Sequence, residues 1–444
     1  MSRKSRNKKK FEPYLIEDLK LEKFVNGGQA LGYTVEGKPI FGWGGITGEI
    51  VDVQVLKSKR GVLEALVEKV KLKSENRIEP IEPDEYLSTS PWQILSLDYE
   101  NQVKAELLEQ TFKHELGLEL EDSELISSDK NTGYGYRNKM EYAFWGDEDG
   151  ISLALHKRGS GQKIKLKGSA LASDAINKAG ESLVGLLNEK QIFAGNLKSL
   201  ILRSDGFGGC AGALFVKAED FLELELPEAL EGLVCYYSNP KSPASIITSE
   251  LWRKGELKLK DQVCGTDIGY DVDSFFQVNI DLFEKVIEDV KLNLDLGDSK
   301  IIDFYGGVGS IGILLAGVET KNKLKIVEIS KESAEMARQN LARLNLSNAE
   351  VFCGAAEDLL EEIEQNSVLV IDPPRAGLHK KVAQKIIEVR PKKLIYLSCN
   401  PVTQARDVGL LLEAGYKIKF NRGYNFFPRT PHIESLVILE NSEQ

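Results

Sequence analysis

Three residues able to take part in covalent or acid–base chemistry lie at the ends of apolar segments that are typical of buried strands. Cys399 follows the segment 393–398, and Asn400 and Pro401 after it suit the cap and first turn of a helix. A thiol at a helix N-terminus meets partial positive charge, which favours the nucleophilic thiolate. A lone cysteine is more often a small buried apolar residue, so Cys399 is either a nucleophile or a core residue.

Asp372 and Glu434 are the two carboxylates in comparable places. Asp372 ends an apolar segment, and Pro373 and Pro374 stop the strand behind it. Ligands of open α/β sheets bind outside the carboxyl ends of the strands, so Asp372 and Cys399 are expected at one cleft. Glu434 begins the last apolar segment after a proline-rich turn. It either faces the same cleft or is an ordinary solvated side chain at a strand end.

The segment Asp303–Gly312 reads DFYGGVGSIG, directly after a predicted strand and at the start of a predicted helix. It contains Gly307-x-Gly309-x-x-Gly312, the spacing of a dinucleotide-binding turn, in which glycines let a ligand approach the backbone. Glu328 ends the next predicted strand, where a carboxylate can hold ribose hydroxyls. The pattern favours a nucleoside cofactor and leaves NAD and S-adenosylmethionine open.

Two aromatic segments remain open between two interpretations. The segment 274–279 reads SFFQVN and is either a hydrophobic anchor or a cofactor lid. The segment 133–142 reads GYGYRNKMEY, where tyrosines alternate with Arg137 and Lys139. Interleaved aromatic and cationic side chains suit stacking on unpaired bases, and an ordinary strand end fits as well.

A sheet must position these groups. From Lys300 onward, predicted strands alternate with helices, which indicates a parallel sheet covered on both faces. Two closing strands without a helix between them imply one antiparallel strand. Residues 14–74 form short β-rich runs separated by glycine turns, which predicts a small barrel. A helix is predicted over 97–116, with Asp98 as its N-cap, and the order of elements over 127–265 is not predicted.

Length and composition describe a globular chain of several domains. Its 444 residues exceed one ordinary core, with 42% hydrophobic and 28% charged residues. No apolar run is long enough for a membrane span, and the basic N-terminus has no apolar stretch behind it, so a cytoplasmic location without membrane contact is expected. The net charge of −11 is unlike that of a duplex-coating protein. The first ten residues are either a solvated tail or a nucleic-acid-binding arm.

The cysteines do not suggest a metal site. The five of them are scattered with no C-x-x-C pair, and only four histidines are present. No metal is therefore expected, and an odd number of cysteines in an intracellular chain indicates free thiols.

The motifs FFQVN, DFYGGVGS, VEIS, IDPPRAGL, YLSCNP and FPRTPHIE, in this order, resemble the RNA (uracil-5-)-methyltransferase family over nearly the whole chain. The resemblance implies an α/β class I S-adenosylmethionine-dependent methyltransferase domain with a seven-stranded mixed sheet. It also implies an OB-like, TRAM-like N-terminal barrel and an α+β central domain that carries YRNKMEY. The expected parts are a basic flexible tail (1–13), the barrel (14–74), a central RNA-binding domain (75–265, whose helix 97–116 packs with the catalytic domain) and the catalytic domain (266–444).

The resemblance also implies roles for individual residues. Cys399 is the expected nucleophile and Glu434 the expected base. The thiolate adds to carbon 6 of uracil, which concentrates electron density on carbon 5; carbon 5 then takes the methyl group, and Glu434 removes its proton. The residues expected to bind the cofactor S-adenosylmethionine are Gln277, Tyr305, Glu328 and Asp372. Those expected to contact RNA are Arg137, Asn138 and Lys139.

The chain departs from the family pattern in three places. Many members carry cysteines for an iron–sulfur cluster just before the helix near Leu97, and none stands there in this chain, so no [4Fe–4S] cluster is expected. Packing around Trp92 is expected to replace it. Ala355 stands where an acid is frequent, so one adenine contact is expected to be missing, and Ser310 stands where Asn is frequent.

Several functions are weighed. The barrel and the length favour 23S rRNA as the substrate, with transfer RNA as the alternative, and a monomer is expected. RNA 5-methylcytosine formation is disfavoured, because that class carries a second cysteine after its Asp-x-Pro and Arg375 stands here. A dehydrogenase using NAD leaves Cys399 and Glu434 without a role. A non-catalytic RNA-binding protein derived from the family is the remaining alternative.

Overall fold

A computed structural model describes residues 11–119, 125–128, 133–296, 299–317 and 322–441 of the chain. Its contacts divide the chain into two compact units. The first runs to Val103 and includes His156–Gln162 and Pro428–Pro431, and the second contains the remainder. Most of the expected tail, 1–10, lies outside the described residues, and the four-part division into domains stays a prediction. Within the described ranges, no helix is both long and apolar enough to cross a membrane.

The first unit contains the predicted barrel, which is closed and has the strand order β1-β2-β3-β5-β4. Val51, Val53 and Val55 of β4 have no exposed surface and fill its interior. Closure leaves the barrel without free sheet edges. The elements are β1 (Tyr14–Phe24), β2 (Ala30–Tyr33), β3 (Pro39–Trp43), β4 (Ile50–Lys59), β5 (Val62–Leu72) and the short helix α1 (Tyr86–Thr89).

Helix α2 spans Leu97–Leu116, as the sequence predicts. The prediction that Asp98 caps it is wrong, because Asp98 lies inside the first turn. Ser96 takes that place, and its side-chain oxygen accepts a backbone N–H of the first turn at 3.4 Å. Leu108 and Phe112 of α2 pack into one core of the eight-stranded C-terminal sheet.

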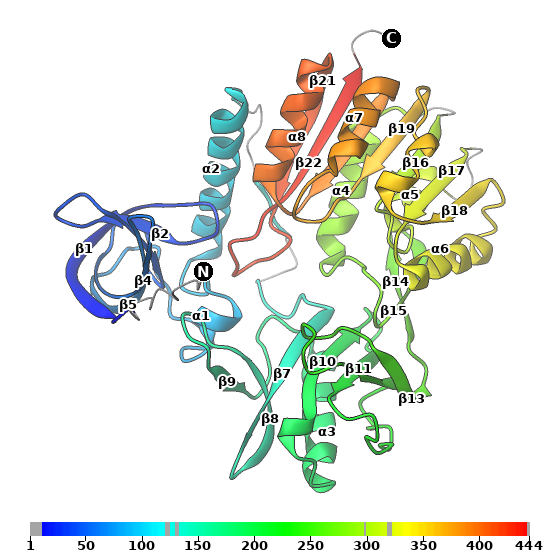
Figure 1. The fold of residues 1–444 in the computed structure, drawn as a ribbon. Coiled ribbons are helices and arrows are strands. Elements are labelled where there is room, and N and C mark those ends of the chain that lie inside the picture. The colour runs from blue at the N-terminus through cyan, green and yellow to red at the C-terminus, as the bar shows by residue number, and fades with distance from the viewer. Residues whose placement is uncertain (1–10, 120–124, 129–132, 297–298, 318–321, 442–444) are drawn as a thin grey trace, which may run out of the picture. The chain divides into compact units, whose positions relative to one another are not determined.

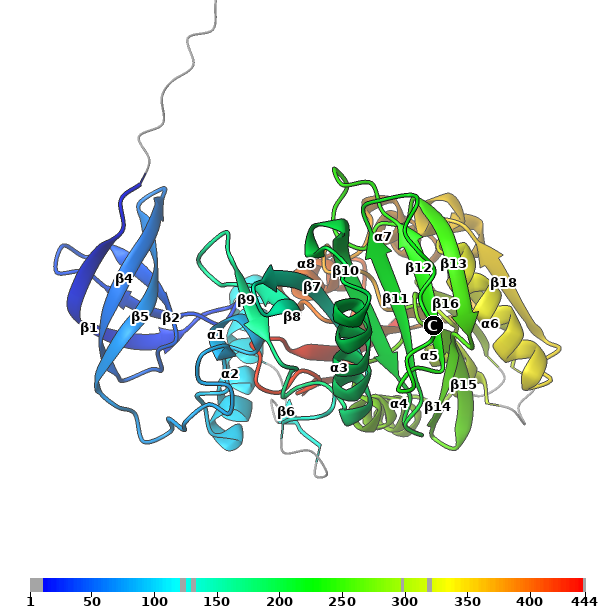
Figure 2. The ribbon, with the colours of Figure 1, turned by 90° about the horizontal axis from the view of Figure 1, so that it is seen from below.

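A seven-stranded sheet with the order β13-β12-β11-β10-β7-β8-β9 forms the central part of the chain. Helix α3 lies along one face of this sheet (Figure 2), where its Ile176 and Leu183 pack with Leu200 and Leu202 of β10. The elements are β7 (Lys139–Asp147), β8 (Gly150–His156), β9 (Lys163–Leu166), α3 (Asp174–Glu189), β10 (Leu197–Ser204), β11 (Cys210–Val216), β12 (Gly232–Tyr237), β13 (Ser249–Gly255) and a separate hairpin of β14 (Lys258–Val263) and β15 (Thr266–Asp271).

The C-terminal part is built on an eight-stranded sheet with the order β18-β17-β16-β19-β20-β22-β21-β6. The first five strands in this order are parallel, and β22 is antiparallel to β20. The elements are β6 (Leu125–Ile126), α4 (Ile280–Asn293), β16 (Lys300–Phe304), α5 (Ser310–Ala316), β17 (Leu324–Glu328), α6 (Lys331–Arg343), β18 (Ala349–Cys353), β19 (Ser367–Ile371), α7 (Lys380–Val389), β20 (Lys393–Ser398), α8 (Pro401–Glu413), β21 (Tyr416–Tyr424) and β22 (Glu434–Asn441).

The α/β mixed sheet is confirmed, with one strand more than the seven expected. The additional strand, β6, pairs with β21 through only two residues. So short a strand has no periodic pattern by which a sequence can reveal it.

Consecutive residues of the parallel strands alternate between two cores. Ile301 and Val368 pack with α4, α5 and α6, whereas Ile302 and Leu369 pack with α2, α7 and α8. Helices therefore cover both faces of the sheet (Figure 1), as expected for a parallel sheet. The carboxyl ends of its strands meet along one edge, which is where ligands of such sheets bind.

Candidate active site

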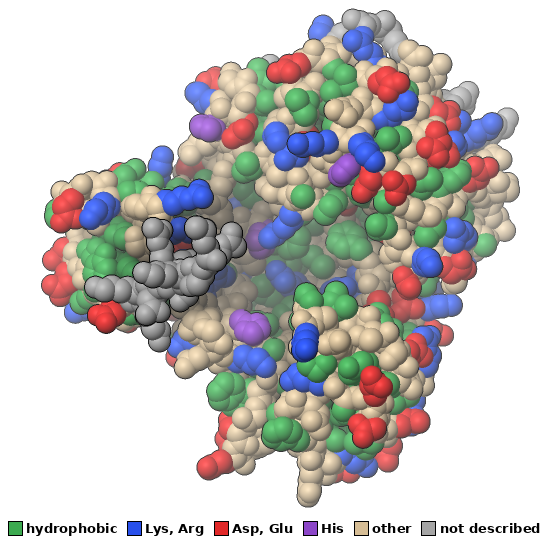
Figure 3. Space-filling view, viewed as in Figure 1, with side chains coloured by type: hydrophobic (Ala, Val, Ile, Leu, Met, Phe, Trp, Pro, Cys, Tyr) green, Lys and Arg blue, Asp and Glu red, His purple; other side chains and the backbone are tan. Residues whose placement is uncertain are grey.

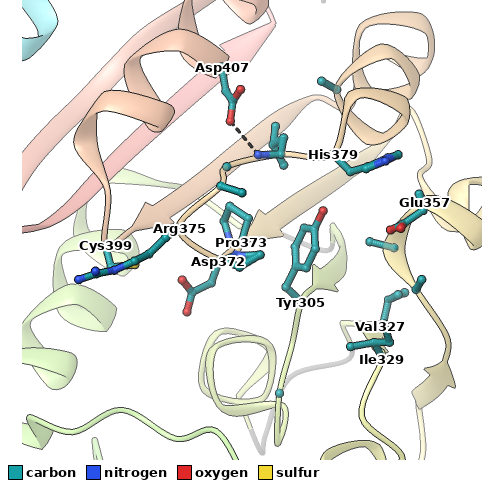
Figure 4. A pocket seen from close by; sticks show the side chains of 18 of the residues that line it. Tyr305, Val327, Ile329, Glu357, Asp372, Pro373, Arg375, His379, Cys399 and Asp407 are labelled. Atoms are coloured by element: carbon teal, nitrogen blue, oxygen red, sulfur yellow. Dashed lines mark hydrogen bonds between the residues drawn. The ribbon is translucent and has the colours of Figure 1, made fainter. Parts of the chain in front are cut away.

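A cavity of about 1060 Å³ opens at the carboxyl ends of the parallel strands, and Figure 4 shows part of its lining. All of the residues expected to bind cofactor or carry out chemistry line this cavity, although they are widely separated in the chain. They are Gln277, Tyr305, Glu328, Asp372, Cys399 and Glu434.

Strand pairing brings Cys399 and Glu434 together. The antiparallel ladder between β20 and β22 ends with Ser398 opposite Ser435. The next position on one side is Cys399 and on the other Glu434, so the two lie opposite each other at the end of one ladder. Opposite residues of an antiparallel pair have Cβ atoms roughly 4.5–5.5 Å apart on the same face. The thiol and the carboxylate therefore face the cavity side by side.

The surroundings of Cys399 oppose its ionisation. Burial and the charges of Glu434 and Asp372 raise the pKa of the thiol to about 11, while Arg375 acts in the opposite direction. The start of α8 was expected to favour the thiolate, but burial and two carboxyl groups shift the pKa of Cys399 in the opposite direction. Asn400 takes the N-cap position, but its side chain donates to the Arg375 carbonyl at 2.8 Å instead of capping the helix.

The two carboxyl groups facing the thiol have raised pKa values. Glu434 is 4% exposed, and its burial together with the charge of Asp372 raises its pKa well above the ordinary value. Burial raises the pKa of Asp372 to about 7, although a hydrogen bond from Gln277 Nε2 at 3.2 Å favours the ionised form. A carboxyl group that changes protonation near neutral pH, as Asp372 does, is suited to proton transfer.

The glycines after β16 serve two different purposes. Gly307 lines the cavity, and a Cβ there would meet no atom closer than 3.6 Å, so this position leaves room for a ligand. Gly309 and Gly312 instead pack against β17. A Cβ on them would lie 2.7 Å from Ile326 and 2.8 Å from Leu324, so the backbone packs closely against these side chains.

Tyr305 and Glu328 form another part of the lining. Tyr305 has a φ of 62°, a left-handed conformation that is uncommon for a non-glycine residue. Both carboxylate oxygens of Glu328 accept backbone hydrogen bonds, one from Gly307 at 2.9 Å and one from Ser330 at 2.7 Å. A carboxylate has about four acceptor positions, so Glu328 can also accept bonds from hydroxyl groups.

Ala355 lines the cavity at the position where the family pattern led us to expect an acid. Glu357, two residues further in a short 3-10 turn, lines the same wall, and its carboxylate turns toward the cavity (Figure 4). Glu357 was not identified from the sequence. The available signal was an acid two residues after the position where the family pattern has one. Ser310, at the start of α5, is 8% exposed and does not line the cavity.

The central sheet holds the cavity-wall segment 274–277. Arg203 of β10 has no exposed surface and donates to two carbonyl oxygens of this segment, one of them, Phe276 O, at 2.9 Å. Asn138 Nδ2 donates to Gln277 O at 3.0 Å. These bonds fix the backbone from which Gln277 reaches the cavity. Asn138 is only 7% exposed, and its expected contact with RNA stays a prediction.

Arg137 and Lys139 do not line the cavity. The Arg137 guanidinium lies 6.0 Å from the ring centroid of Phe427, a residue of the cavity wall. Lys139 lies opposite Arg203 in the ladder between β7 and β10. Burial and the charge of Arg203 lower the pKa of Lys139 to about 8. Of the two cations, Arg137 is thus the one beside the cavity.

Arg375 is a further residue of the site. It lines the cavity and runs alongside Cys399 in Figure 4, and its charge favours the thiolate by lowering the pKa of Cys399. Its Nη2 atom lies 2.9 Å from Nδ1 of His432. In the sequence, Arg375 is a cation directly after a proline pair at a strand end. There it served only as an argument against 5-methylcytosine formation and was not predicted to belong to the site.

Trp92 of the first unit is buried, and its proposed replacement of a cluster stays a prediction. It is 1% exposed, its ring centroid lies 5.2 Å from that of Phe24, and its Nε1 donates to Gly28 O at 2.9 Å. Among the described residues, no group of three or more His, Cys, Asp or Glu side chains is arranged to hold a metal. The absence of an iron–sulfur cluster stays a prediction.

Residues 253–442 match a family model described as tRNA (Uracil-5-)-methyltransferase. The chain is 30% identical to an uncharacterized RNA methyltransferase of Caldanaerobacter subterraneus subsp. tengcongensis, over 96% of this chain and 99% of the relative. It is 27% identical to another of Fusobacterium nucleatum subsp. nucleatum, over 96% of each.

A solved structure has a similar fold. It is the crystal structure of Pyrococcus abyssi tRNA (uracil-54, C5)-methyltransferase in complex with S-adenosyl-L-homocysteine. The TM-score is 0.74 at 24% identity, and the likeness covers 96% of this chain and all of the other. This likeness confirms the α/β fold that the sequence predicts.

Proposed function

The chain belongs to the RNA (uracil-5-)-methyltransferase family, and we propose that it methylates a uridine of 23S rRNA through a covalent adduct between Cys399 and carbon 6 of the base. The observation that carries this proposal is that Cys399 and Glu434 both directly adjoin the last residue pair of the β20–β22 ladder and line one cavity. The expected monomeric state and cytoplasmic location stay predictions.

The cavity fits S-adenosylmethionine. Glu328 offers acceptors for ribose hydroxyls at the end of β17, and Gly307 has no side chain to obstruct a ligand. Tyr305 and Glu357 line the wall next to these residues and would contact the adenosine part. When bound, this cofactor supplies the methyl group. Gln277 and Asp372, joined by a hydrogen bond, would complete the site near Cys399.

The chain's own residues account for the remaining chemistry. Carbon 5 of uracil is a weak nucleophile until Cys399 adds to carbon 6, because the addition moves electron density to carbon 5. After carbon 5 has taken the methyl group, Glu434 removes the carbon-5 proton and the bond between sulfur and carbon 6 breaks. A positioned general base is worth roughly 10²–10⁴-fold in rate. The raised pKa of buried Glu434 makes it a stronger base than an exposed glutamate.

The target uridine must leave its stack to reach Cys399, as for other enzymes that act on a base. The chain is acidic overall, and on the face seen in Figure 3 cationic and anionic side chains are interspersed. Contacts with RNA are therefore expected from local groups such as Arg137. The N-terminal barrel, which resembles a TRAM domain, favours 23S rRNA. Transfer RNA is the second candidate, because the matching family model and the similar solved structure are both named for it.

The experiment incubates the protein with methyl-tritiated S-adenosylmethionine and separate 23S and transfer RNA transcripts, followed by mapping of the labelled base. We expect label at carbon 5 of one uridine in 23S rRNA. Cys399→Ala should abolish labelling, and Glu434→Gln should accumulate a covalent protein–RNA adduct. Cys264→Ala is the matched control, because Cys264 is exposed and does not line the cavity.

Three outcomes would contradict parts of the proposal. Normal turnover by Cys399→Ala would exclude the covalent mechanism. Labelling of transfer RNA alone would replace the substrate and keep the mechanism. Binding of RNA without any transfer, by protein shown to bind the cofactor, would favour a non-catalytic RNA-binding role.

A further inference from the structure

The structure leaves one step of the proposed function unexplained, namely how Cys399 becomes a thiolate. Burial and two carboxyl groups oppose ionisation of the thiol by raising its pKa. We propose that Arg375 is a catalytic residue that stabilises the Cys399 thiolate, and that His432 holds its guanidinium in place. This inference rests on the proposed role of Cys399 as nucleophile.

The backbone of Arg375 is fixed next to the nucleophile. Its carbonyl oxygen accepts a hydrogen bond from Asn400 Nδ2 at 2.8 Å and another from Thr403 Oγ1 at 3.2 Å. Asn400 directly follows Cys399, and Thr403 lies in the first turn of α8. The loop after β19 is thereby tied to the end of β20, so Arg375 keeps its position relative to the sulfur. This also explains why Asn400 does not cap its own helix.

The guanidinium is held from the other side. Arg375 Nη2 lies 2.9 Å from Nδ1 of His432, and because arginine has only donors, this nitrogen must accept and be unprotonated. The His432 ring packs edge-on against Phe427, with centroids 5.9 Å apart. The Arg375 side chain itself runs alongside Cys399 (Figure 4). Arg375 thus lies between the His432 ring and the reacting sulfur.

The charges around Cys399 make this contact significant. The charged groups that act on it are Asp372 and Arg375 on the loop after β19 and Glu434 at the start of β22, while His432 contacts Arg375. Both carboxyl groups oppose a thiolate, and Arg375 is the cation that counteracts them. Arginine stays charged at any working pH, so its effect does not depend on a second titration. Lysine at this position would keep the charge and lose the planar fork that reaches two partners at once.

The same contact serves both covalent steps. In the first, the Cys399 sulfur forms a bond to carbon 6 and the pyrimidine takes up the negative charge. In the last, this bond breaks, its electron pair returns to sulfur, and carbon 5 has lost its proton to Glu434. A guanidinium beside the sulfur stabilises the thiolate before the first step and after the last. Its removal should slow attack and elimination alike.

The test measures thiolate formation without RNA or cofactor. Cys399 is alkylated with iodoacetamide at several values of pH between 6.5 and 9.5 in a Cys264→Ser, Cys353→Ser background, and peptide mass spectrometry follows the modified sulfur. Only the thiolate displaces iodide, so the rate reports the thiolate fraction. Arg375→Met and Arg375→Lys leave side chains of similar length, so their difference reports charge and not access.

We expect Arg375→Met to lower the alkylation rate at each pH by about tenfold or more, the effect of removing an opposite charge next to an ionisable group. Arg375→Lys should stay within about threefold of the parent, since it keeps the charge. His432→Gln should give a smaller fall than Arg375→Met in the same direction. Arg338→Ala, an exposed arginine of α6 outside the cavity, should change nothing.

Equal rates for the parent and Arg375→Met would overturn the proposal. A variant with an unchanged alkylation rate and weakened RNA binding in a filter assay would also overturn it, because Arg375 would then contact phosphate. An unchanged rate in His432→Gln would remove His432 from the proposal. The alkylation assay does not use the methylation reaction. A failure of the Arg375 proposal can therefore be told apart from a failure of the proposed function, which would appear as labelling by Cys399→Ala.

Discussion

Asp303 should make the stability of the second unit fall as pH rises. It lies in β16 beneath the glycine turn and is 1% exposed. Its Oδ2 accepts the backbone N–H of Gly312 at 2.8 Å, and its Oδ1 has no hydrogen-bond partner among the residues that the structure describes. Burial raises its pKa to about 7 from an ordinary value of 3.8. The substitution Asp303→Asn removes the charge and keeps one acceptor for Gly312.

The magnitude follows from proton linkage. Between pH 4 and pH 7 the folded protein holds a proton on Asp303 that the unfolded chain has released, so stability decreases with pH over this range and is lowest above it. A tenfold change in proton affinity corresponds to about 1.4 kcal/mol, so the full cost at pH 8 is about 4 kcal/mol. Asn carries no such cost. We therefore expect the stability of Asp303→Asn relative to the parent to increase by about 2 kcal/mol between pH 5.5 and pH 8.

The assay is urea unfolding of both proteins at these two pH values, with the transition of the sheet-containing unit followed separately. Asp220→Asn is the matched control, because Asp220 is exposed and the same chemical change there should give no pH-dependent difference. The reasoning would be refuted if the stability difference between Asp303→Asn and the parent did not change with pH. It would also be refuted if the variant were less stable relative to the parent at pH 8 than at pH 5.5.

Three further predictions concern packing and the cavity wall. Trp92→Ala should destabilise the first unit by about 3–5 kcal/mol, as for other buried aromatic residues. Trp92→Phe should lower the free energy of unfolding by only about 1 kcal/mol, because it removes the hydrogen bond and keeps most of the ring. Thermal unfolding of the two variants checks this difference. Glu357→Gln should weaken S-adenosylmethionine binding by about tenfold, measured by calorimetry, because a hydrogen bond to a charged group is lost; an unchanged affinity would place the adenine elsewhere. Arg203→Met should leave two buried carbonyls unpaired and release the segment that carries Gln277, so it should raise the KM for S-adenosylmethionine more than it lowers kcat. Arg203→Lys should recover part of this loss. Equal effects on KM and kcat would argue against a positioning role for Arg203.

The sequence predicted the parts of the site that depend on strand order. Cys399, Asp372 and Glu328 each end a parallel strand, and parallel strands end at one edge, so their gathering followed from the alternation of strands and helices. Glu434 was identified from its place at the start of the last strand, although its exact register opposite Cys399 is seen only in the structure. The same reasoning located the glycine turn.

The parts that were missed depend on groups brought close only by folding. The pKa of Cys399 is set by burial and by Glu434 and Asp372, none of which is near it in the chain, so the local helix start gave the wrong direction. Arg203 lies in a strand of the central sheet, and no motif connects it with the segment at 274–277. Glu357 was overlooked because the sequence was searched for an adenine-binding acid only at position 355. A short turn places Glu357, two residues further on, on the same wall.

Cys399 and Glu434 both lie at the end of one strand ladder. The chain between them is therefore not needed to align them. Helix α8 and strand β21 lie between the two in the chain, but the inter-strand bonds of β20 and β22 hold the register. Insertions or even a cut at the turn containing Gly415 would leave nucleophile and base facing each other, so this turn is a natural point for circular permutation or for splitting the enzyme into two complementing fragments. Deleting a single residue within either strand would instead send one of the two groups to the opposite face.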